Sequence, residues 1–179
     1  MCGICGFTGQ IVDRNETIKN MTDVITHRGP DSDGLFQDDY ISMGFRRLSI
    51  IDLDGGTQPI YNEDKSLVIT FNGEIYNYKI LREQLIKAGH KFYTDTDSEV
   101  LIHGFEEWGE EMLPKLRGMF GFAIYNKNDG SLFIARDFFG IKPMHYTLID
   151  GNLVYGSEIK SILQHPDFKK EFNEKALDS

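Results

Sequence analysis

The sequence predicts an α+β fold in which antiparallel sheets are covered by helices. Strand-like segments lie on both sides of a helical middle, an order that does not suit a wound parallel sheet. The pairs Asp129-Gly130 and Asp150-Gly151 each join two strand-like segments, and such pairs are typical of antiparallel hairpins. The length of 179 residues suits one domain.

The first part of the chain alternates between strand and helix signals. Residues 4–12 predict a short strand pair or a strand followed by a turn, because glycines interrupt the segment. A helical pattern then places Ile18, Met21 and Ile25 on one side and ends before Gly29-Pro30. Two further strands are expected at residues 40–45 and 67–71.

Helices dominate the middle of the chain, and strands return after it. A helix is expected from Tyr78 to a stop at Gly89, and a second from Asp97-Ser98 to Gly109. Either Asp97 or Ser98 is a suitable cap for the second helix. A short helical stretch is expected at 112–116. Strands follow at 119–125, 132–137, 144–149 and 153–155.

Composition and charge exclude several functional classes. The net charge is −9 and no Lys/Arg cluster interrupts it, so a nucleic-acid partner is not expected. No uncharged apolar run approaches the ~20 residues of a membrane span. The N-terminus lacks the pattern of a signal peptide, and two cysteines do not form a disulfide framework. We therefore expect a cytoplasmic protein.

Cys2 is the leading candidate for a nucleophile. Methionine aminopeptidases remove Met1 before a small residue, which leaves Cys2 with both a thiol and a free α-amino group. That amine titrates at about 7.7–8.0 in model compounds, so it can accept the thiol proton near neutral pH. An N-terminal cysteine therefore supplies its own general base. Gly3 allows the backbone to bend tightly beside it.

The same residues admit other interpretations. Cys2 and Cys5 form C-x-x-C, which occurs in redox pairs and zinc sites. A redox pair normally opens a helix after a strand, and nothing precedes Cys2 here. A zinc site needs two further ligands, and the five histidines show no ligand spacing. Taken alone, Cys5 is better explained as a small buried residue.

Three further segments carry side chains suited to binding or catalysis. Asn72-Gly73 follows an apolar strand and offers an amide beside a flexible N–H, as an oxyanion hole requires, although an ordinary turn has the same sequence. Arg46-Arg47 offers donors for a carboxylate but also fits an exposed surface. Asp97 suits an ammonium group or a helix cap.

Together these segments resemble the class II glutamine amidotransferases, and among them the asparagine synthetase type. The resemblance follows nearly the whole chain in order. The matching stretches are Met1-Cys2-Gly3-Ile4-Cys5-Gly6, His27-Arg28-Gly29-Pro30-Asp31, Arg47-Leu48-Ser49-Ile50-Ile51-Asp52, Asn72-Gly73-Glu74-Ile75-Tyr76-Asn77, Asp95-Thr96-Asp97-Ser98-Glu99, Gly118-Met119-Phe120-Gly121-Phe122-Ala123, Arg136-Asp137, Gly140-Ile141-Lys142-Pro143, Ser157-Glu158 and Lys160.

The resemblance implies an N-terminal-nucleophile hydrolase fold, a four-layer αββα sandwich with two antiparallel sheets between helices. It implies Cys2 as the nucleophile and Asn72 and Gly73 as the oxyanion hole. Glutamine would be bound by Arg47 at its carboxylate and by Glu74 and Asp97 at its α-amino group. The segment Leu48, Ser49, Ile50 and Ile51 would line the pocket, and residues 27–31 would support the site.

The resemblance also implies partners and a place in a longer enzyme. Ammonia released from L-glutamine would pass to a C-terminal synthetase domain that uses ATP and magnesium to convert aspartate to asparagine. We expect residues 1–163 to form the amidotransferase domain, with no cofactor or metal of its own, and residues 164–179 to begin the linker. A homodimer is compatible with this reading, and related enzymes amidate other acceptors.

Overall fold

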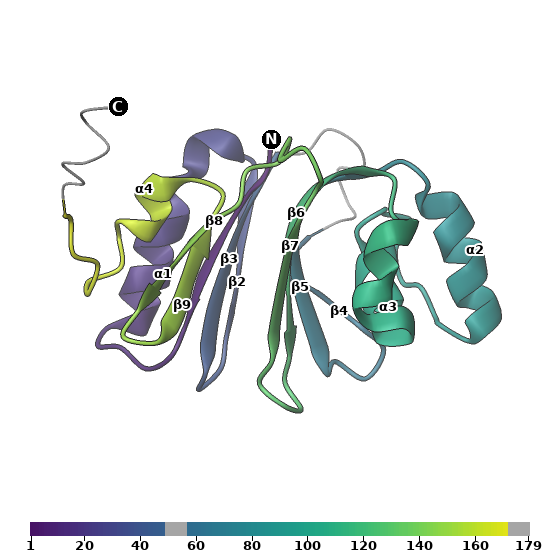
Figure 1. The fold of residues 1–179 in the computed structure, drawn as a ribbon, viewed down its shortest axis with the longest axis horizontal. Helices are drawn as coiled ribbons and strands as arrows, with labels where there is room; N and C mark the ends of the chain where they lie inside the picture. Colours follow the sequence, from purple (N-terminus) through teal and green to yellow (C-terminus); the bar gives the residue numbers. More distant parts are fainter. Residues whose placement is uncertain (49–56, 172–179) are drawn as a thin grey trace.

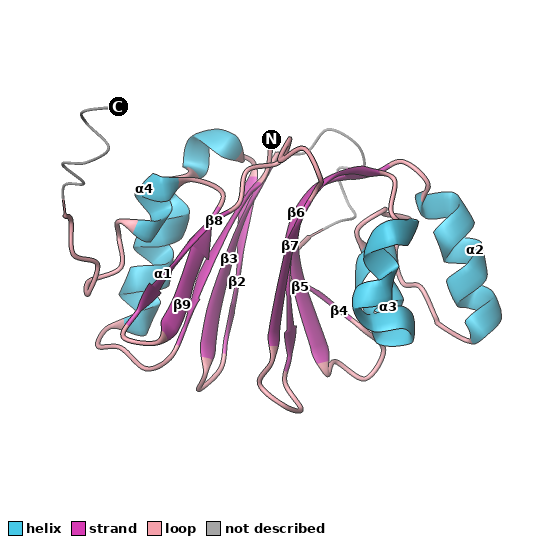
Figure 2. Cartoon of the chain, in the orientation of Figure 1, coloured by secondary structure: helices cyan, strands magenta, loops and turns pink. Residues whose placement is uncertain are grey.

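A computed structural model describes residues 1–48 and 57–171 of the chain. Two antiparallel sheets stack face to face, and helices cover the outer face of each (Figures 1 and 2). The predicted α+β sandwich of two antiparallel sheets between helical layers is therefore confirmed. Within the described ranges, no helix is both long and apolar enough to cross a membrane.

The first sheet contains the N-terminal strand at its centre. Its strand order is β2-β3-β1-β9-β8, and every neighbouring pair is antiparallel. Its elements and the helices beside it are β1 (Gly3–Thr8), α1 (Arg14–Asp23), η1 (Thr26–Arg28), β2 (Ser32–Gln37), β3 (Ile41–Arg47), β8 (His145–Ile149), β9 (Asn152–Gly156) and α4 (Ile159–Ile162).

The second sheet has the order β4-β5-β6-β7 and is also antiparallel throughout. Strand β5 pairs with β6 along its whole length, from Leu67↔Asn126 to Ile75↔Gly118. The elements of this half are β4 (Ile60–Tyr61), β5 (Leu67–Ile75), α2 (Tyr78–Ala88), α3 (Glu99–Trp108), η2 (Gly109–Lys115), β6 (Gly118–Asn126) and β7 (Leu132–Arg136).

Three hydrophobic clusters hold the four layers together. One lies between α1 and the first sheet and includes Cys5, Ile18 and Met21. The middle cluster lies between the two sheets and includes Ile4 of β1 and Val68 of β5. The third packs α2 and α3 on the outer face of the second sheet. Because side chains alternate along each strand, a single strand contributes to two clusters.

The expected elements are found close to their predicted positions. Both Asp-Gly pairs form hairpin turns, and Asp150 and Gly151 have the positive φ values of 48° and 82° that such turns require. Gly89 ends α2 at φ 111°. Ser98 is the N-terminal cap position of α3, but its side chain makes no capping hydrogen bond.

Three elements were not anticipated, namely β2, β4 and the short helix α4. Strand β5 is also longer than expected and continues through Asn72 and Gly73 to Ile75. The alternative of an ordinary Asn-Gly turn at this position is therefore wrong. Past the expected boundary at residue 163, His165 is buried against Phe7 and Phe168 packs on the cluster beside α1.

Candidate functional site

Cys2 lies at the entrance to the layer between the two sheets. It immediately precedes β1, is partly buried, and packs against the middle hydrophobic cluster. Its Sγ lies 3.9 Å from the backbone oxygen of Leu48, at the end of β3. The candidate nucleophile is thus placed beside Leu48, the first residue of the segment expected to line the pocket.

An arginine with a largely buried side chain holds the backbone of Cys2. The Nε of Arg28 donates a hydrogen bond to the Cys2 carbonyl oxygen at 3.0 Å, and its Nη1 donates to Glu158 at 3.0 Å. Glu158 also accepts bonds from His27 at 2.8 Å and Lys160 at 2.9 Å. Residues 27–31 were expected to support the site, and Arg28 of this segment contacts the Cys2 peptide directly.

The environment of Glu158 favours its charged form. Partial burial by itself raises the pKa of this carboxyl, but the hydrogen bonds from Lys160, Arg28 and His27 outweigh it and lower the pKa to about 2. The carboxylate is therefore ionised at neutral pH and neutralises the guanidinium of Arg28, whose side chain is only 9% exposed.

Cys5 lies on the other side of the first sheet. It is fully buried beside Thr22 of α1, and burial raises the pKa of its thiol to about 11. Cys2 packs instead on the cluster between the sheets. Two positions three residues apart along a strand point to opposite faces, so the C-x-x-C pair cannot form a disulfide or share a metal ion here.

Arg47 and Leu48 stand at the end of β3, on the same side of the molecule as Cys2. Arg47 pairs in register with Ser32 of β2, and its carbonyl accepts the N–H of Asp31 at 3.1 Å. The other expected pocket residues, Ser49, Ile50 and Ile51, lie outside the described residues.

Asn72 lies on the face of β5 that looks toward the first sheet, because it alternates with Phe71 and shares its face with Val68. The side chain is 3% exposed. Its Nδ2 has no hydrogen-bond acceptor among the residues that the structure describes. A buried amide donor without an acceptor is costly, so this group is a candidate for a functional role.

The backbone N–H of Gly73 points away from β6, toward the other edge of the same strand. Its partner on β6 is Phe120, whose N–H donates to the Asp137 side chain and whose carbonyl accepts the Asp137 N–H. Gly73 and Phe120 are therefore a pair that shares no hydrogen bond. On that edge Gln58 accepts the N–H of Phe71 and Asp97 accepts the N–H of Ile75. The Gly73 N–H lies between the N–H groups of Phe71 and Ile75, and no residue that the structure describes accepts a hydrogen bond from it.

Asp97 is brought to this strand end by the start of α3. Its Oδ2 accepts the N–H of Ile75 at 2.7 Å. Burial, and next the neighbouring carboxylate of Glu74, raise the pKa of Asp97 above its usual value. The side chain of Glu74 itself is exposed. The carboxyl groups of Asp97 and Glu74 therefore lie near each other at the end of the strand that carries Asn72 and Gly73. Their role as an ammonium subsite stays a prediction.

A loop after β7 links the Asn72 end of the second sheet to the N-terminus. Asp137 accepts the backbone N–H groups of Phe120, Ile141 and Lys142 at 2.9–3.2 Å. Burial raises the pKa of Asp137, but these donors outweigh it and hold the pKa below its usual value. The buried Lys142 then reaches Met1, with Nζ 3.2 Å from the methionine sulfur.

Sequence reasoning gave no individual role to Arg28, Glu158, Asp137 or Lys142. All four belong to stretches that carry the family resemblance. The resemblance therefore pointed to these positions but did not predict which residues they contact. Arg28 and Glu158 are 130 residues apart. Arg28 bonds Cys2 just before β1, and Glu158 follows β9, so the pairing of β1 with β9 in the first sheet helps to bring them together.

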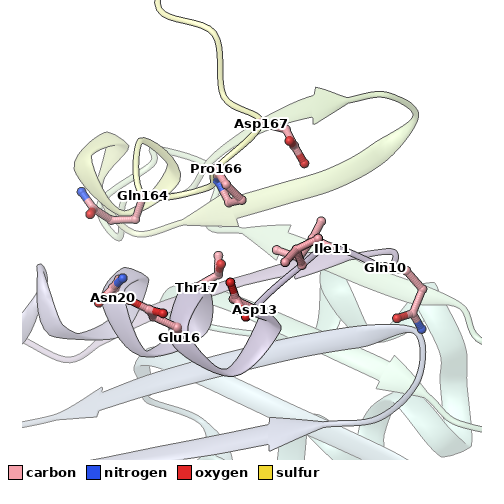
Figure 3. Close-up of a pocket in the computed structure, with 10 residues that line it drawn as sticks. Gln10, Ile11, Asp13, Glu16, Thr17, Asn20, Gln164, Pro166 and Asp167 are labelled. Carbon is pink, nitrogen blue, oxygen red and sulfur yellow. The ribbon is translucent and has the colours of Figure 1, made fainter.

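Figure 3 shows a separate surface pocket between the start of α1 and residues 164–167. It contains none of the predicted site residues. The charged side chains in its lining are Asp13, Glu16 and Asp167, with no basic residue among them. Such a lining does not suit a ligand carboxylate, so this pocket is not a candidate for glutamine.

Comparison with known sequences gives a match over the entire chain. The family described as glutamine amidotransferase domain matches residues 1–179. Asparagine synthetase [glutamine-hydrolyzing] 1 of Bacillus subtilis is 51% identical over 89% of this chain and 27% of its own length. Asparagine synthetase [glutamine-hydrolyzing] 2 of Arabidopsis thaliana is 43% identical over 90% and 28%, respectively. The chain thus spans about a quarter of these relatives.

Solved structures share the fold at much lower sequence identity. Glutamine phosphoribosylpyrophosphate amidotransferase from B. subtilis superposes with a TM-score of 0.73, at 19% identity, over 90% of this chain and 43% of its own. A structure described as the allosteric regulatory enzyme of purine biosynthesis gives a TM-score of 0.74 at 20% identity, over 91% and 43%. Both likenesses support the N-terminal-nucleophile hydrolase fold.

Proposed function

The chain belongs to the glutamine amidotransferase domain family, and from that premise we propose that it hydrolyses the side-chain amide of L-glutamine to glutamate and ammonia. Cys2 is the nucleophile in this proposal. Because the full-length relatives are glutamine-hydrolysing asparagine synthetases, the ammonia is destined for an ATP-dependent synthetase domain that forms asparagine from aspartate.

One observation carries the proposal. Asn72 and Gly73 present two adjacent donors, Nδ2 and a backbone N–H, to which the described residues offer no acceptor. Two such donors match the needs of a tetrahedral oxyanion, and losing one of them typically lowers kcat about 10²–10³-fold. Cys2 packs against the cluster beneath the same face of β5.

The reaction proceeds by acyl transfer through sulfur. After removal of Met1, the α-amino group of Cys2 takes the thiol proton, and Sγ attacks the amide carbon of glutamine. The oxyanion binds Asn72 and Gly73, the amine returns a proton to the leaving nitrogen, and the C–N bond breaks to release ammonia. Water then attacks the glutamyl thioester, which releases glutamate and restores the thiol.

The remaining site residues supply charges that match the substrate. Arg47 binds the α-carboxylate of glutamine, and Asp97 with Glu74 binds its ammonium group. Arg28 supports the reaction indirectly, because its bond to the Cys2 carbonyl fixes the peptide from which the thiol projects. The domain needs no cofactor for this hydrolysis; ATP and magnesium belong to the synthetase step. We place the enzyme in the cytoplasm.

The test is glutamate release from glutamine by purified chain whose intact mass shows the loss of Met1. Cys2→Ala is expected to abolish turnover, and Asn72→Ala to lower kcat about 10²–10³-fold. Cys5→Ser is the matched control, since Cys5 lies on the opposite face of the sheet and its replacement should leave kcat within a few-fold.

Two results would contradict the proposal. Met1-free chain that releases no glutamate in the presence of the synthetase domain would exclude the hydrolase function. Equal losses in Cys2→Ser and Cys5→Ser would show that the effect is not specific to a nucleophile at Cys2. The acceptor is tested separately, by asking whether glutamine supports amidation of aspartate by the full-length enzyme.

A further inference from the structure

Two histidines and two glutamates converge on the helical side of the second sheet, away from the glutamine site. One ligand atom from each of Glu63, His90, His103 and Glu106 lies within 4.8 Å of the others. Glu63 stands in the turn between β4 and β5, His90 directly follows the end of α2, and His103 and Glu106 are one turn apart on α3. We propose that these four residues form a zinc-binding site.

The bonding within this cluster is incomplete without a cation. His103 is fully buried, and its Nδ1 lies 3.2 Å from the Oε2 of Glu63. Neither atom forms a hydrogen bond with any residue in the described parts of the chain. Buried polar atoms nearly always have partners. A cation bound by both atoms supplies the missing interaction to each.

The distances suit a tetrahedral ion. Ligands about 2.0–2.1 Å from zinc lie about 3.3–3.4 Å from one another. The Nδ1 of His103 is 3.2 Å from Glu63 and 4.0 Å from Glu106, and the Nδ1 of His90 is 3.3 Å from Glu63 and 3.8 Å from Glu106. Both of the longer distances involve Glu106, whose side chain is 37% exposed, and an inward turn of this side chain would shorten them.

Both histidines are also oriented as metal ligands usually are. The Nε2 of His103 lies 3.4 Å from Glu99, which is itself buried, and the Nε2 of His90 lies 3.3 Å from Glu107. A carboxylate on the far nitrogen fixes the ring and leaves the other nitrogen as the ligand. Both rings show this arrangement, so Glu99 and Glu107 would orient the two histidines that bind the metal.

The donor set identifies the class of metal. Two imidazole nitrogens and two carboxylate oxygens suit zinc and related first-row transition ions, whereas calcium and magnesium prefer oxygen ligands alone. A bound ion would join the β4–β5 turn, the end of α2 and α3, and so clamp the helical layer to the sheet. This proposal revises the expectation of a metal-free domain, which rested on the linear spacing of the histidines.

The experiment is a Zn²⁺ titration of EDTA-treated protein by calorimetry, with Cys2 alkylated beforehand so that its thiol cannot bind the metal. We expect one zinc per chain, and a rise of about 5–10 °C in the thermal unfolding midpoint when free zinc is 100 times Kd. Co²⁺ in place of zinc should give the strong visible absorption of a four-coordinate ion.

Glu106→Gln should weaken zinc binding more than about 100-fold, because loss of an outer partner alone costs about 10–100-fold. This side chain is partly exposed, so the variant should fold, and far-UV circular dichroism checks that it does. Glu83→Gln, an exposed carboxylate of α2 outside the cluster, is the matched control and should bind zinc like the parent.

The proposal fails if zinc does not bind at one ion per chain, or if Glu106→Gln binds it as tightly as the parent. Magnesium stabilising the protein as well as zinc would also overturn it, since the cluster would then be a set of histidine–carboxylate ion pairs with adventitious cations. None of these readouts depends on glutamine turnover, so the result stands apart from the test of Cys2.

Discussion

Replacing Glu158 with glutamine should weaken the support beneath Cys2 and lower the stability of the fold. The carboxylate binds Arg28, His27 and Lys160 together. Glutamine keeps the shape of the side chain and removes its charge. Arg28 is then left nearly buried without its anionic partner, and its Nη2 already lacks a hydrogen-bond partner among the described residues.

The magnitude follows from the pKa of Glu158. Partial burial raises the pKa, but hydrogen bonds from Lys160, Arg28 and His27 prevail and lower it from 4.5 to about 2. At about 1.4 kcal/mol per pH unit, the difference amounts to about 3 kcal/mol of stability. The side chain is 25% exposed, and solvent screening reduces the expected loss to about 2 kcal/mol.

The sign of the pH dependence is fixed by the same shift. A carboxyl whose pKa is lower in the folded state contributes its full stability above its unfolded pKa of about 4.5. That contribution disappears as the pH falls through about 2. The free energies of unfolding of the parent and of Glu158→Gln should therefore differ most at pH 7 and converge between pH 4.5 and 2.

The assay is urea unfolding followed by the fluorescence of Trp108, the one tryptophan of the chain, at pH 7, 4 and 3. Asp95→Asn is the matched control. Asp95 also pairs with an arginine, Arg82, at 3.3 Å, but it is 99% exposed, so its loss should not change stability measurably. A Glu158→Gln deficit that is the same at pH 7 and pH 3 would refute the reasoning.

Two further predictions concern the candidate site. Gly73→Ala places a Cβ 2.2 Å from the backbone oxygen of Met119 and should lower the free energy of unfolding by about 2–3 kcal/mol in urea titrations. Gly121→Ala, whose nearest contact is 3.6 Å, should change it by less than about 1 kcal/mol; equal effects would contradict the geometry. Burial and the neighbouring Glu74 raise the pKa of Asp97. The KM for glutamine should therefore rise as the pH falls, and this rise should begin at a pH above the usual carboxyl pKa. Asp97→Asn should raise KM and flatten that profile, and an unchanged KM would remove Asp97 from the site.

Local features of the fold were readable from the sequence because each depends on a few adjacent residues. The Asp-Gly hairpins and the stop at Gly89 follow from the freedom of glycine to adopt positive φ. Strand β2 was missed because its segment SDGLFQ is polar and alternates between intermediate and exposed positions. The pattern of an amphipathic core strand is absent there, and only pairing with β3 makes it a strand.

For the site, the sequence by itself predicted which residues carry the chemistry: the thiol of Cys2, the amide of Asn72 and the carboxyl of Asp97. The tertiary structure decided their relations. It alone separates Cys2 from Cys5 across a sheet, and it leaves the Asn72 amide buried without an acceptor among the described residues. It also joins Arg28 to Glu158 across 130 residues. The physical reason is the distance along the chain over which each effect acts. Turn and strand preferences depend on neighbouring residues. Burial and charge pairing depend instead on strand order and on which layer packs against each face of a sheet.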